Sequence, residues 1–334
     1  MVKPTFSRFI QLQILLCFLV SNTVLNAQNE SFIYGDALPD APELASRGAY
    51  KIGVRTLDLV NKGQVDVLNS KNGMDPIYDR PLKVEVWYPA LLALEATELA
   101  IYKDVMGTAH DSLRPLTPIT FKGRASRDAA PLATEGPFPL LVVAHGYVGS
   151  RYLMTYLTEN LASKGYIVVA IDHTDSTFRD ASPFSSTLVN RAKDISFVMN
   201  QIGDLGKANN KHFLSGLVDS ENIGIIGYSM GGYGVLNVAG AGYSDGLVDF
   251  FSRMTGGSKA IAELAMSNPN FPKVDPRIKA VVAFAPWGME RGVWDTEGLK
   301  GLKIPTFFIA GSQDDISGYE KGIKAIFEGA VNTD

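Results

Sequence analysis

The sequence contains only one cysteine, Cys17, and it lacks the residue clusters on which protein metal sites depend. It has no cluster of Cys and His, no H-E-x-x-H motif and no regular ladder of Asp residues. Asp172, Asp175 and Asp180 are close together in the sequence, but such a group is more typical of a solvated loop than of a cation site. We therefore expect neither a metal nor a cofactor.

A basic cluster is also missing. Lys and Arg number 31 against 35 Asp and Glu, which gives a formal net charge of −4. Without a local excess of positive charge, nothing in the chain attracts a phosphate backbone. The charge distribution therefore excludes nucleic acid as an expected partner.

The apolar run near the N-terminus, Ile14–Val20, is too short to span a bilayer. Lys3 and Arg8 precede it, and a small residue suited to cleavage, Ala27, follows it. We interpret residues 1–27 as a secretory signal peptide, which predicts a secreted or periplasmic protein without stable membrane insertion. The residues before Cys17 are leucines rather than the small residues that precede lipid attachment. Cleavage removes the only cysteine, so we expect the core and not disulfides to stabilise the mature chain.

Residues 28–334 are expected to form one α/β domain, because apolar runs typical of strands alternate with amphipathic segments typical of helices. The predicted strands are 50–60, 81–88, 138–144, 166–171, 222–228, 278–285 and 304–310, and the predicted helices are 150–164, 186–205, the segment after 230 and the segment after 316. This order predicts a mostly parallel, doubly wound sheet with helices on both faces. Binding sites in such sheets lie beyond the carboxyl ends of the strands.

Two stretches interrupt this alternation. Residues 91–136 form a polar, Pro-rich insertion with a predicted helix near 95–105 and with His110 in a loop. Residues 240–276 contain apolar clusters separated by Gly-Gly and Asn-Pro, which fits either a cap over the site or a pair of ordinary packing helices.

The segment 222–234 holds the strongest functional pattern in the chain. Its branched apolar residues end abruptly at Gly227-Tyr228-Ser229-Met230-Gly231. A G-x-S-x-G pattern between a strand and a helix is typical of a nucleophile elbow, a turn that raises the serine hydroxyl above the sheet. Ordinary Gly-rich turns also contain this pattern, but the flanking strand and helix and a second Gly-containing loop at 145–147 favour catalysis.

Three motifs together resemble the α/β-hydrolase superfamily: H-G-Y-V-G-S-R at 145–151, G-Y-S-M-G-G at 227–232 and G-S-Q-D-D at 311–315. Within it, the His-Gly loop and V-V-A-I-D-H-T-D-S at 168–176 look like the predicted dienelactone hydrolases and platelet-activating-factor acetylhydrolases. Ser-Met-Gly-Gly at the elbow and Ala-Pro-Trp at 285–287 resemble secreted polyester hydrolases and cutinases. The likeness runs from about residue 50 to the C-terminus.

The resemblance implies that Ser229 is the nucleophile and that the N–H groups of Tyr147 and Met230 form the oxyanion hole. Met230 begins a helix, where an N–H is free and lies at the positive end of the dipole. The resemblance also implies that Asp314, three residues after a strand end, is the triad acid, with Asp315 as the alternative. No metal takes part in this chemistry.

Aromatic residues near these positions are expected to bind the substrate. Trp287, Tyr228, Tyr147 and Met230 would line an apolar pocket for the acyl or aryl part of an ester, with His173 as a neighbour of the site. Core packing is the alternative for each aromatic ring, and above all for Tyr228.

The order of the triad in this fold is Ser, Asp, His, but all four histidines precede Ser229. His145 is expected to shape its loop, and His110 and His212 are expected at the surface. We therefore expect the catalytic histidine to be absent from this sequence, with a C-terminal part missing, and the chain as given to be impaired.

These observations predict a secreted serine hydrolase that cleaves carboxylic esters through an acyl-enzyme on Ser229. The expected substrate is a small-molecule or lipid-like ester, with a polyester, as for cutinases, as an alternative. The alternative from another class is a non-catalytic α/β-hydrolase-fold domain that binds a ligand or partner. The residues specify neither the substrate nor the oligomeric state.

Overall fold

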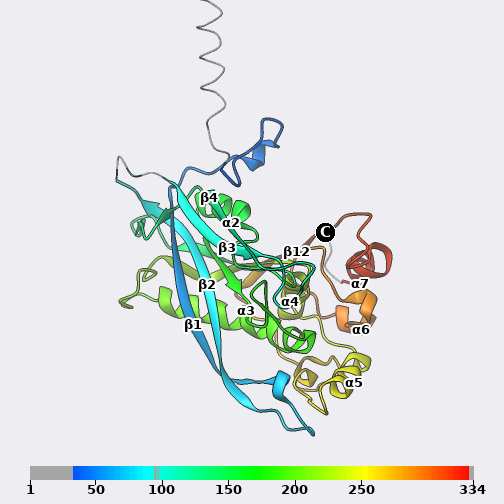
Figure 1. Cartoon of the computed structure of the whole chain (residues 1–334). Coiled ribbons are helices and arrows are strands. Elements are labelled where there is room, and N and C mark those ends of the chain that lie inside the picture. Colours follow the sequence, from blue (N-terminus) through cyan, green and yellow to red (C-terminus); the bar gives the residue numbers. More distant parts are fainter. Residues whose placement is uncertain (1–32, 94–95, 97, 331–334) are drawn as a thin grey trace, which may run out of the picture.

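The computed structural model describes residues 33–93, 96 and 98–330. The expected signal peptide and Cys17 lie outside the described residues. Figure 1 shows a central sheet whose two long strands, β1 and β2, lie at one side of the molecule, while α5, α6 and α7 lie toward the other.

The main sheet has nine strands in the path order β13-β12-β11-β7-β8-β2-β1-β5, with β6 paired to β2. Strands β7, β8, β11, β12 and β13 run parallel, whereas β2 pairs antiparallel with both β1 and β8. The strand bounds are β1 (Ile52–Val65), β2 (Ile77–Leu91), β5 (Ser126–Arg127), β6 (Ala130–Pro131), β7 (Phe138–Ala144), β8 (Ile167–Asp172), β11 (Val218–Tyr228), β12 (Ile278–Phe284) and β13 (Thr306–Ile309). The predicted strands and the antiparallel edge are confirmed.

Helices cover both faces of this sheet. Val142 of β7 packs in one core cluster with residues of α3 (Phe184–Gly206) and α4 (Met230–Val238). Its neighbour Val143 packs in a second cluster with Ala162 of α2 (Thr155–Ser163). Successive side chains of a strand point to opposite faces, so two core clusters on one strand require a layer on each side. The doubly wound α/β architecture is confirmed.

Helix α3 buries the face that its sequence periodicity predicts. The apolar residues expected to face inward are all buried: Leu188, Ala192, Ile195, Val198, Met199 and Ile202. Helix α2 differs, because its predicted apolar positions Tyr156, Leu157 and Leu161 are exposed or half-buried, while Thr158 and Glu159 are buried. A hairpin packs against α2 on the same face of the sheet, and its Tyr102 donates a hydrogen bond to the buried Glu159 Oε1 at 2.7 Å.

This hairpin corrects the prediction of a helix near 95–105. Residues Ala100–Met106 form β3, which pairs antiparallel with β4 (Thr117–Gly123). Ala100 and Tyr102 are buried and Ile101 and Lys103 exposed, a period of two that belongs to a strand. The expected position of His110 is confirmed, because it lies in the turn region between the two strands with φ of 65°.

The segment 240–276 contributes to the main core. Leu247 and Phe251 of α5 (Asp245–Met254) and Ile261 are buried in the same cluster as α3 and α4. These contacts show that the segment packs against the main core. A capping role for 240–276 stays a prediction. The remaining short elements are β9 (Ser176–Thr177), β10 (Asp180–Ala181), α6 (Thr296–Leu299) and α7 (Ala325–Gly329), the last preceded by a π-helical turn, Tyr319–Lys324.

Candidate active site

Ser229 lies on the sharp turn between β11 and α4. Its φ of 53° and ψ of −113° lie outside the regions that most residues adopt, so the surrounding structure must hold it there. Three backbone hydrogen bonds do so. Ser229 N–H donates to Phe284 O at 2.8 Å, and Ser229 O accepts from Tyr233 N–H at 2.9 Å and from Trp287 N–H at 3.2 Å. The position of Ser229 is therefore fixed by β12 and by the chain that follows it.

The two glycines of the G-x-S-x-G pattern are required by close backbone contacts. A Cβ at Gly227 would lie 2.2 Å from Gly231 O, and a Cβ at Gly231 would lie 2.0 Å from Ala144 O. Real Cβ atoms do not approach other atoms so closely. Glycine is therefore sterically required at both positions.

The loop after β7 comes directly against the elbow. A Cβ on Gly146 would lie only 3.2 Å from the Ser229 Cβ, so the Gly146-Tyr147 backbone lies beside the nucleophile. Within the described residues, Tyr147 N–H donates no hydrogen bond, and Met230, as the first residue of α4, has no helical acceptor for its own N–H. The structure thus places the Tyr147 segment next to Ser229 and Met230, and the role of the two N–H groups as oxyanion donors stays a prediction.

A buried polar network lies beneath this loop. The His145 ring, 2% exposed, contacts Gly146 O through Nδ1 at 2.6 Å and accepts a hydrogen bond from His173 N–H through Nε2 at 3.2 Å. Arg191 of α3 donates to His145 O at 2.8 Å. Burial, with help from the Arg191 charge, holds the pKa of His145 well below its usual value of 6.5. A neutral His145 therefore shapes the loop, and no sequence pattern indicated Arg191 as its support.

His173 belongs to the same network and is only 1% exposed. Its Nδ1 lies 3.0 Å from Asp194 Oδ2, and Arg80 pairs with the same carboxylate at 2.8 Å. Burial is the main reason that the pKa of His173 is well below 6.5, with Arg191 and Arg80 adding to the effect. The ring faces the interior of the protein. The structure therefore does not support the expected contact between His173 and the substrate.

The two adjacent carboxylates at the end of β13 have different surroundings. Asp314 is half-buried, and its Oδ1 accepts hydrogen bonds from Ile316 N–H at 2.9 Å and Ser317 N–H at 2.8 Å. Ser317 Oγ donates to Ala285 O at 3.0 Å, which ties this loop to the end of β12 near Trp287. Asp315 is exposed. The geometry thus orients Asp314 and leaves Asp315 to solvent.

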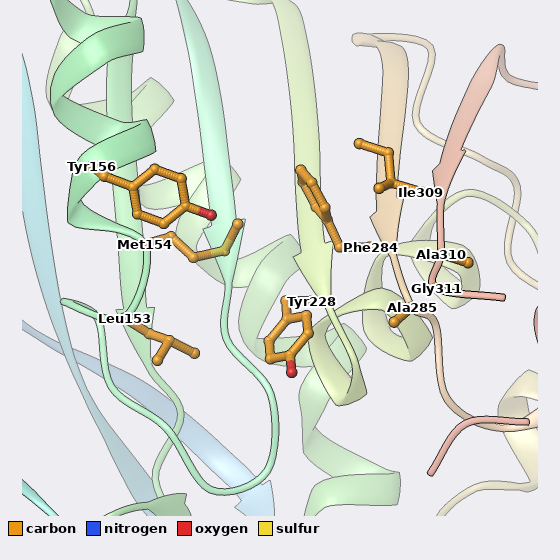
Figure 2. Close-up of a pocket in the computed structure, with 9 residues that line it drawn as sticks. All are labelled: Leu153, Met154, Tyr156, Tyr228, Phe284, Ala285, Ile309, Ala310 and Gly311. Carbon is orange, nitrogen blue, oxygen red and sulfur yellow. The ribbon is translucent and has the colours of Figure 1, made fainter. Parts of the chain in front are cut away.

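An apolar hollow of about 280 Å³ lies beside the elbow. Figure 2 shows Met154 and Tyr156 on one side of it, Phe284 and Ile309 on the other, and Tyr228 between them. Tyr228 is 42% exposed, so it lines a surface and is not part of the core.

Trp287 and Tyr147 lie around a third ring that the sequence did not single out. Phe184, at the start of α3, has its ring centroid 5.0 Å from that of Tyr147 and 5.0 Å from that of Trp287, both in edge-to-face orientation. Trp287 also contacts Tyr233, with centroids 6.5 Å apart. No local pattern indicated Phe184, because its partners are distant in sequence.

The remaining histidines are not associated with Ser229. His212 precedes β11 and so lies at the opposite end of that strand from the elbow, where its ring contacts Phe213. His110 is exposed. Within the described residues, no histidine makes a hydrogen bond with Ser229.

Comparisons with known proteins agree with this geometry. A family model described as PETase, PET hydrolase-like, matches residues 127–244, which include both the loop after β7 and the elbow. Cutinase 2 from Thermobifida cellulosilytica and cutinase cut1 from Thermobifida fusca are each 23% identical to the chain over 177 residues, or 53% of its length. These matches span 48% and 40% of the two cutinases, about half of their length or less.

A ferulic acid esterase from Streptomyces cinnamoneus has a similar structure, with a TM-score of 0.53 and 21% identity over 87% of this chain and 74% of the esterase. The chain has the α/β-hydrolase fold, and part of its sequence is similar to cutinases. Among residues 33–93, 96 and 98–330, no group of three or more His, Cys, Asp or Glu side chains is placed to hold a metal ion. The same residues include no helix with the length and apolar character needed to cross a membrane.

Proposed function

We propose that this α/β-hydrolase is an exported serine esterase that cleaves carboxylic esters through an acyl-enzyme on Ser229. The observation that carries the proposal is the elbow, where Ser229 is held at φ 53° with the Gly146-Tyr147 backbone against it. Such a site presents a hydroxyl to a carbonyl carbon and two N–H groups to the oxygen that becomes negative. The names of its relatives, cutinase, PET hydrolase-like and ferulic acid esterase, support ester cleavage.

In this mechanism, Ser229 Oγ attacks the ester carbonyl, and the N–H groups of Tyr147 and Met230 stabilise the tetrahedral oxyanion. Each such donor contributes roughly 3 kcal/mol to lowering the barrier. Collapse of the intermediate releases the alcohol, and water then releases the acid from Ser229. Asp314 is the proposed triad acid, because two backbone N–H groups fix its Oδ1.

None of the four histidines, His110, His145, His173 and His212, provides the general base of the triad. His145 and His173 are buried and engaged with other groups, His212 lies at the far end of β11, and His110 is exposed and makes no hydrogen bond with Ser229. We propose that the catalytic histidine is not among residues 1–334 and that this chain alone hydrolyses esters slowly. Loss of the histidine from a serine triad lowers the rate by roughly 10⁶-fold.

Hydrolysis of p-nitrophenyl acetate by the wild-type chain and by Ser229→Ala, each with and without added imidazole, tests the proposal. We expect slow hydrolysis that depends on Ser229 and that imidazole increases, because free imidazole can take the proton that the missing side chain would take. Fast hydrolysis without imidazole would show that a base is present after all. Equal rates for both proteins under all conditions would favour the non-catalytic binding domain.

The specificity for the acid part of the ester is measured with a form of the protein that hydrolyses esters at a measurable rate. A series of p-nitrophenyl esters of rising chain length separates the short-chain and lipid-like substrates expected from the dienelactone hydrolase and acetylhydrolase resemblance. A polyester film tests the cutinase-like alternative. Release of soluble acid from the film above the Ser229→Ala background would support a polyester hydrolase.

A further inference from the structure

A second apolar hollow, of about 280 Å³, lies against the β3–β4 hairpin, and we call it the hairpin hollow. It shares only Leu153 with the hollow beside the elbow. Side chains on one face of the paired strands β3 and β4 form one of its walls, and the segments that follow β7 and β9 form the others. Its apolar lining includes Met106, Ile119, Phe121, Tyr152, Leu153 and Phe178.

The aromatic part of this lining is packed from behind. The Phe121 and Tyr152 rings lie 6.4 Å apart, edge to face, and both pack against Tyr102, at centroid distances of 5.2 Å and 5.1 Å. The Tyr152 hydroxyl donates to Glu85 Oε2 at 3.1 Å and accepts from Arg151 Nη2 at 2.8 Å. Since the hydroxyl is engaged with these groups, Tyr152 contributes an apolar ring to the hollow.

Phe178 is held from two sides by backbone hydrogen bonds. Its N–H donates to Gly149 O at 3.0 Å, and its carbonyl accepts from Ala109 N–H at 2.9 Å. Ala109 lies in the connection between β3 and β4, so these bonds join the hairpin to the segments after β7 and β9. The walls of the hairpin hollow are therefore fixed to one another, as in the largely pre-formed sites that bind small molecules.

A polar hollow of about 210 Å³ adjoins the hairpin hollow, and Asp104, Ser150 and Phe178 line both. We call it the basic hollow. Together the two hollows reach the size of ligand pockets, roughly 300–1,000 Å³. The basic hollow is lined by four cationic side chains, Lys83, Lys103, Arg151 and Arg179, and by two carboxylates, Asp104 and Asp172.

The arginines of the basic hollow are matched by carboxylates. Arg151 pairs with Asp172 and with Glu85, and Glu85 is shared with Arg127. At the junction of the two hollows, Arg179 Nη2 lies 3.8 Å from the Oδ1 atom of Asp104. The positive excess of the basic hollow therefore belongs to its two lysines.

Both lysines are available to an anionic ligand. Lys83 pairs with Asp58, whose side chain is 76% exposed, and an exposed pair of this kind contributes little free energy. Among residues 33–93, 96 and 98–330, Lys103 has no ion-pair partner. An anion at these lysines would gain attraction and would give up no strong existing pair.

We propose that the two hollows form one binding site for a medium-chain carboxylate, with the alkyl chain in the hairpin hollow and the carboxylate at Lys83 and Lys103. Asp104 at the junction repels a carboxylate and so favours this orientation over one with the head group among the apolar side chains. The site does not include Ser229, and the inference does not rest on the proposed esterase function.

Calorimetric titration with octanoate, octanamide and hexanoate tests the two parts of the ligand separately. Octanoate should bind about tenfold more tightly than octanamide, which has the same chain without the charge. Hexanoate lacks two CH₂ groups and should bind about fifteenfold more weakly than octanoate, since each buried CH₂ is worth about fourfold in Kd. Added NaCl should raise the Kd of octanoate and leave that of octanamide nearly unchanged.

Charge and chain contacts are then removed one at a time. Lys103→Glu should weaken octanoate about tenfold and leave octanamide unchanged. Lys211→Glu is its control, because Lys211 is an exposed lysine that precedes β11, at the other end of the sheet. Ile119→Asn should weaken both ligands at least about fivefold, whereas Ile101→Asn, on the opposite face of the hairpin, should weaken neither. Thermal unfolding checks each fold, and Met106→Asn replaces Ile119→Asn if that variant does not fold.

Methyl NMR locates the bound chain. Octanoate should shift the methyl signals of Met106 and Ile119. A shift of Ile309 without these two places octanoate in the hollow beside the elbow and overturns the inference. Absence of octanoate binding, an equal Kd for octanoate and octanamide, or a Kd unchanged by Lys103→Glu does the same. Octanoate has no ester bond and these variants keep Ser229, so the esterase proposal is judged separately by its own assay.

Discussion

At the scale of single residues, steric contacts explain the two glycines of the elbow. Gly227 and Gly231 face backbone atoms of neighbouring segments, and at both positions a Cβ would lie little more than 2 Å from an oxygen. Such contacts involve main chain, which cannot rotate away as a side chain can. The free energy cost of adding one methyl group at either glycine is therefore the cost of displacing β7, β11 or α4.

Gly231→Ala is expected to destabilise the protein strongly, because its Cβ would lie 2.0 Å from Ala144 O. Overpacking of this kind costs roughly 3 kcal/mol or more. The measurement is the free energy of unfolding in urea. Gly311→Ala is the control, because a Cβ there meets nothing within 4 Å and should change stability by less than about 0.5 kcal/mol. Equal stabilities for the two variants would contradict the steric account.

The sequence predicted those residues of the site whose reasons are local. Ser229 and its glycines belong to one turn, and Tyr147 and Met230 follow from the strand ends that precede them. Phe184 and Arg191 were missed, because their partners Tyr147, Trp287 and His145 are tens of residues away and no short pattern reports them. His173 was expected beside the substrate, but burial against Asp194 turns it inward.

At the scale of elements, the β3–β4 hairpin explains both departures of the fold from expectation. Its strand periodicity was hidden by the polar, Pro-rich composition of 91–136, and its packing against α2 buries Glu159, a charged residue that an apolar pattern does not place inward. Tyr102 lies at the centre of this contact: its hydroxyl donates to Glu159 Oε1 at 2.7 Å and accepts from Trp87 Nε1 at 2.9 Å. Burial raises the pKa of Glu159, so the carboxylate depends on such donors.

Tyr102→Phe should therefore lower the free energy of unfolding by about 1 to 3 kcal/mol, because it leaves the buried Trp87 N–H and a Glu159 oxygen without this partner. Urea unfolding followed by fluorescence gives the value. Tyr156→Phe removes a hydroxyl from a side chain that is 43% exposed and should be close to neutral. If both substitutions have the same small effect, the hydrogen bonds to Tyr102 do not hold the hairpin on α2.

At the scale of the whole molecule, two buried histidines link stability to pH. His145 and His173 both have a pKa well below 6.5, mainly because of burial, so they are neutral in the folded protein near neutral pH. In the unfolded chain they take up protons as the pH falls below about 6.5. The unfolded state then binds more protons than the folded state, and acid favours unfolding.

We expect the free energy of unfolding to fall as the pH is lowered from 7 to 5.5, by up to about 1.4 kcal/mol per pH unit for each of the two histidines. Burial raises the pKa of Glu159 and Asp172, which has the opposite sign and reduces the net slope. Urea titrations at several pH values measure the slope, and His173→Gln should reduce it. A free energy of unfolding that stays constant over this range would show that the two rings are not held neutral.

The hydrogen bonds around Ser229 have one more consequence. All three join backbone atoms of Ser229 to backbone atoms of Phe284, Tyr233 and Trp287, and none involves the hydroxyl. The backbone conformation at position 229 therefore does not depend on the identity of the side chain. Ser229→Ala should keep the same elbow and the same proposed oxyanion donors, and so should form a stable complex with an intact ester. Crystals of that variant soaked with an ethyl ester of an aromatic acid would then capture the substrate before any bond is broken.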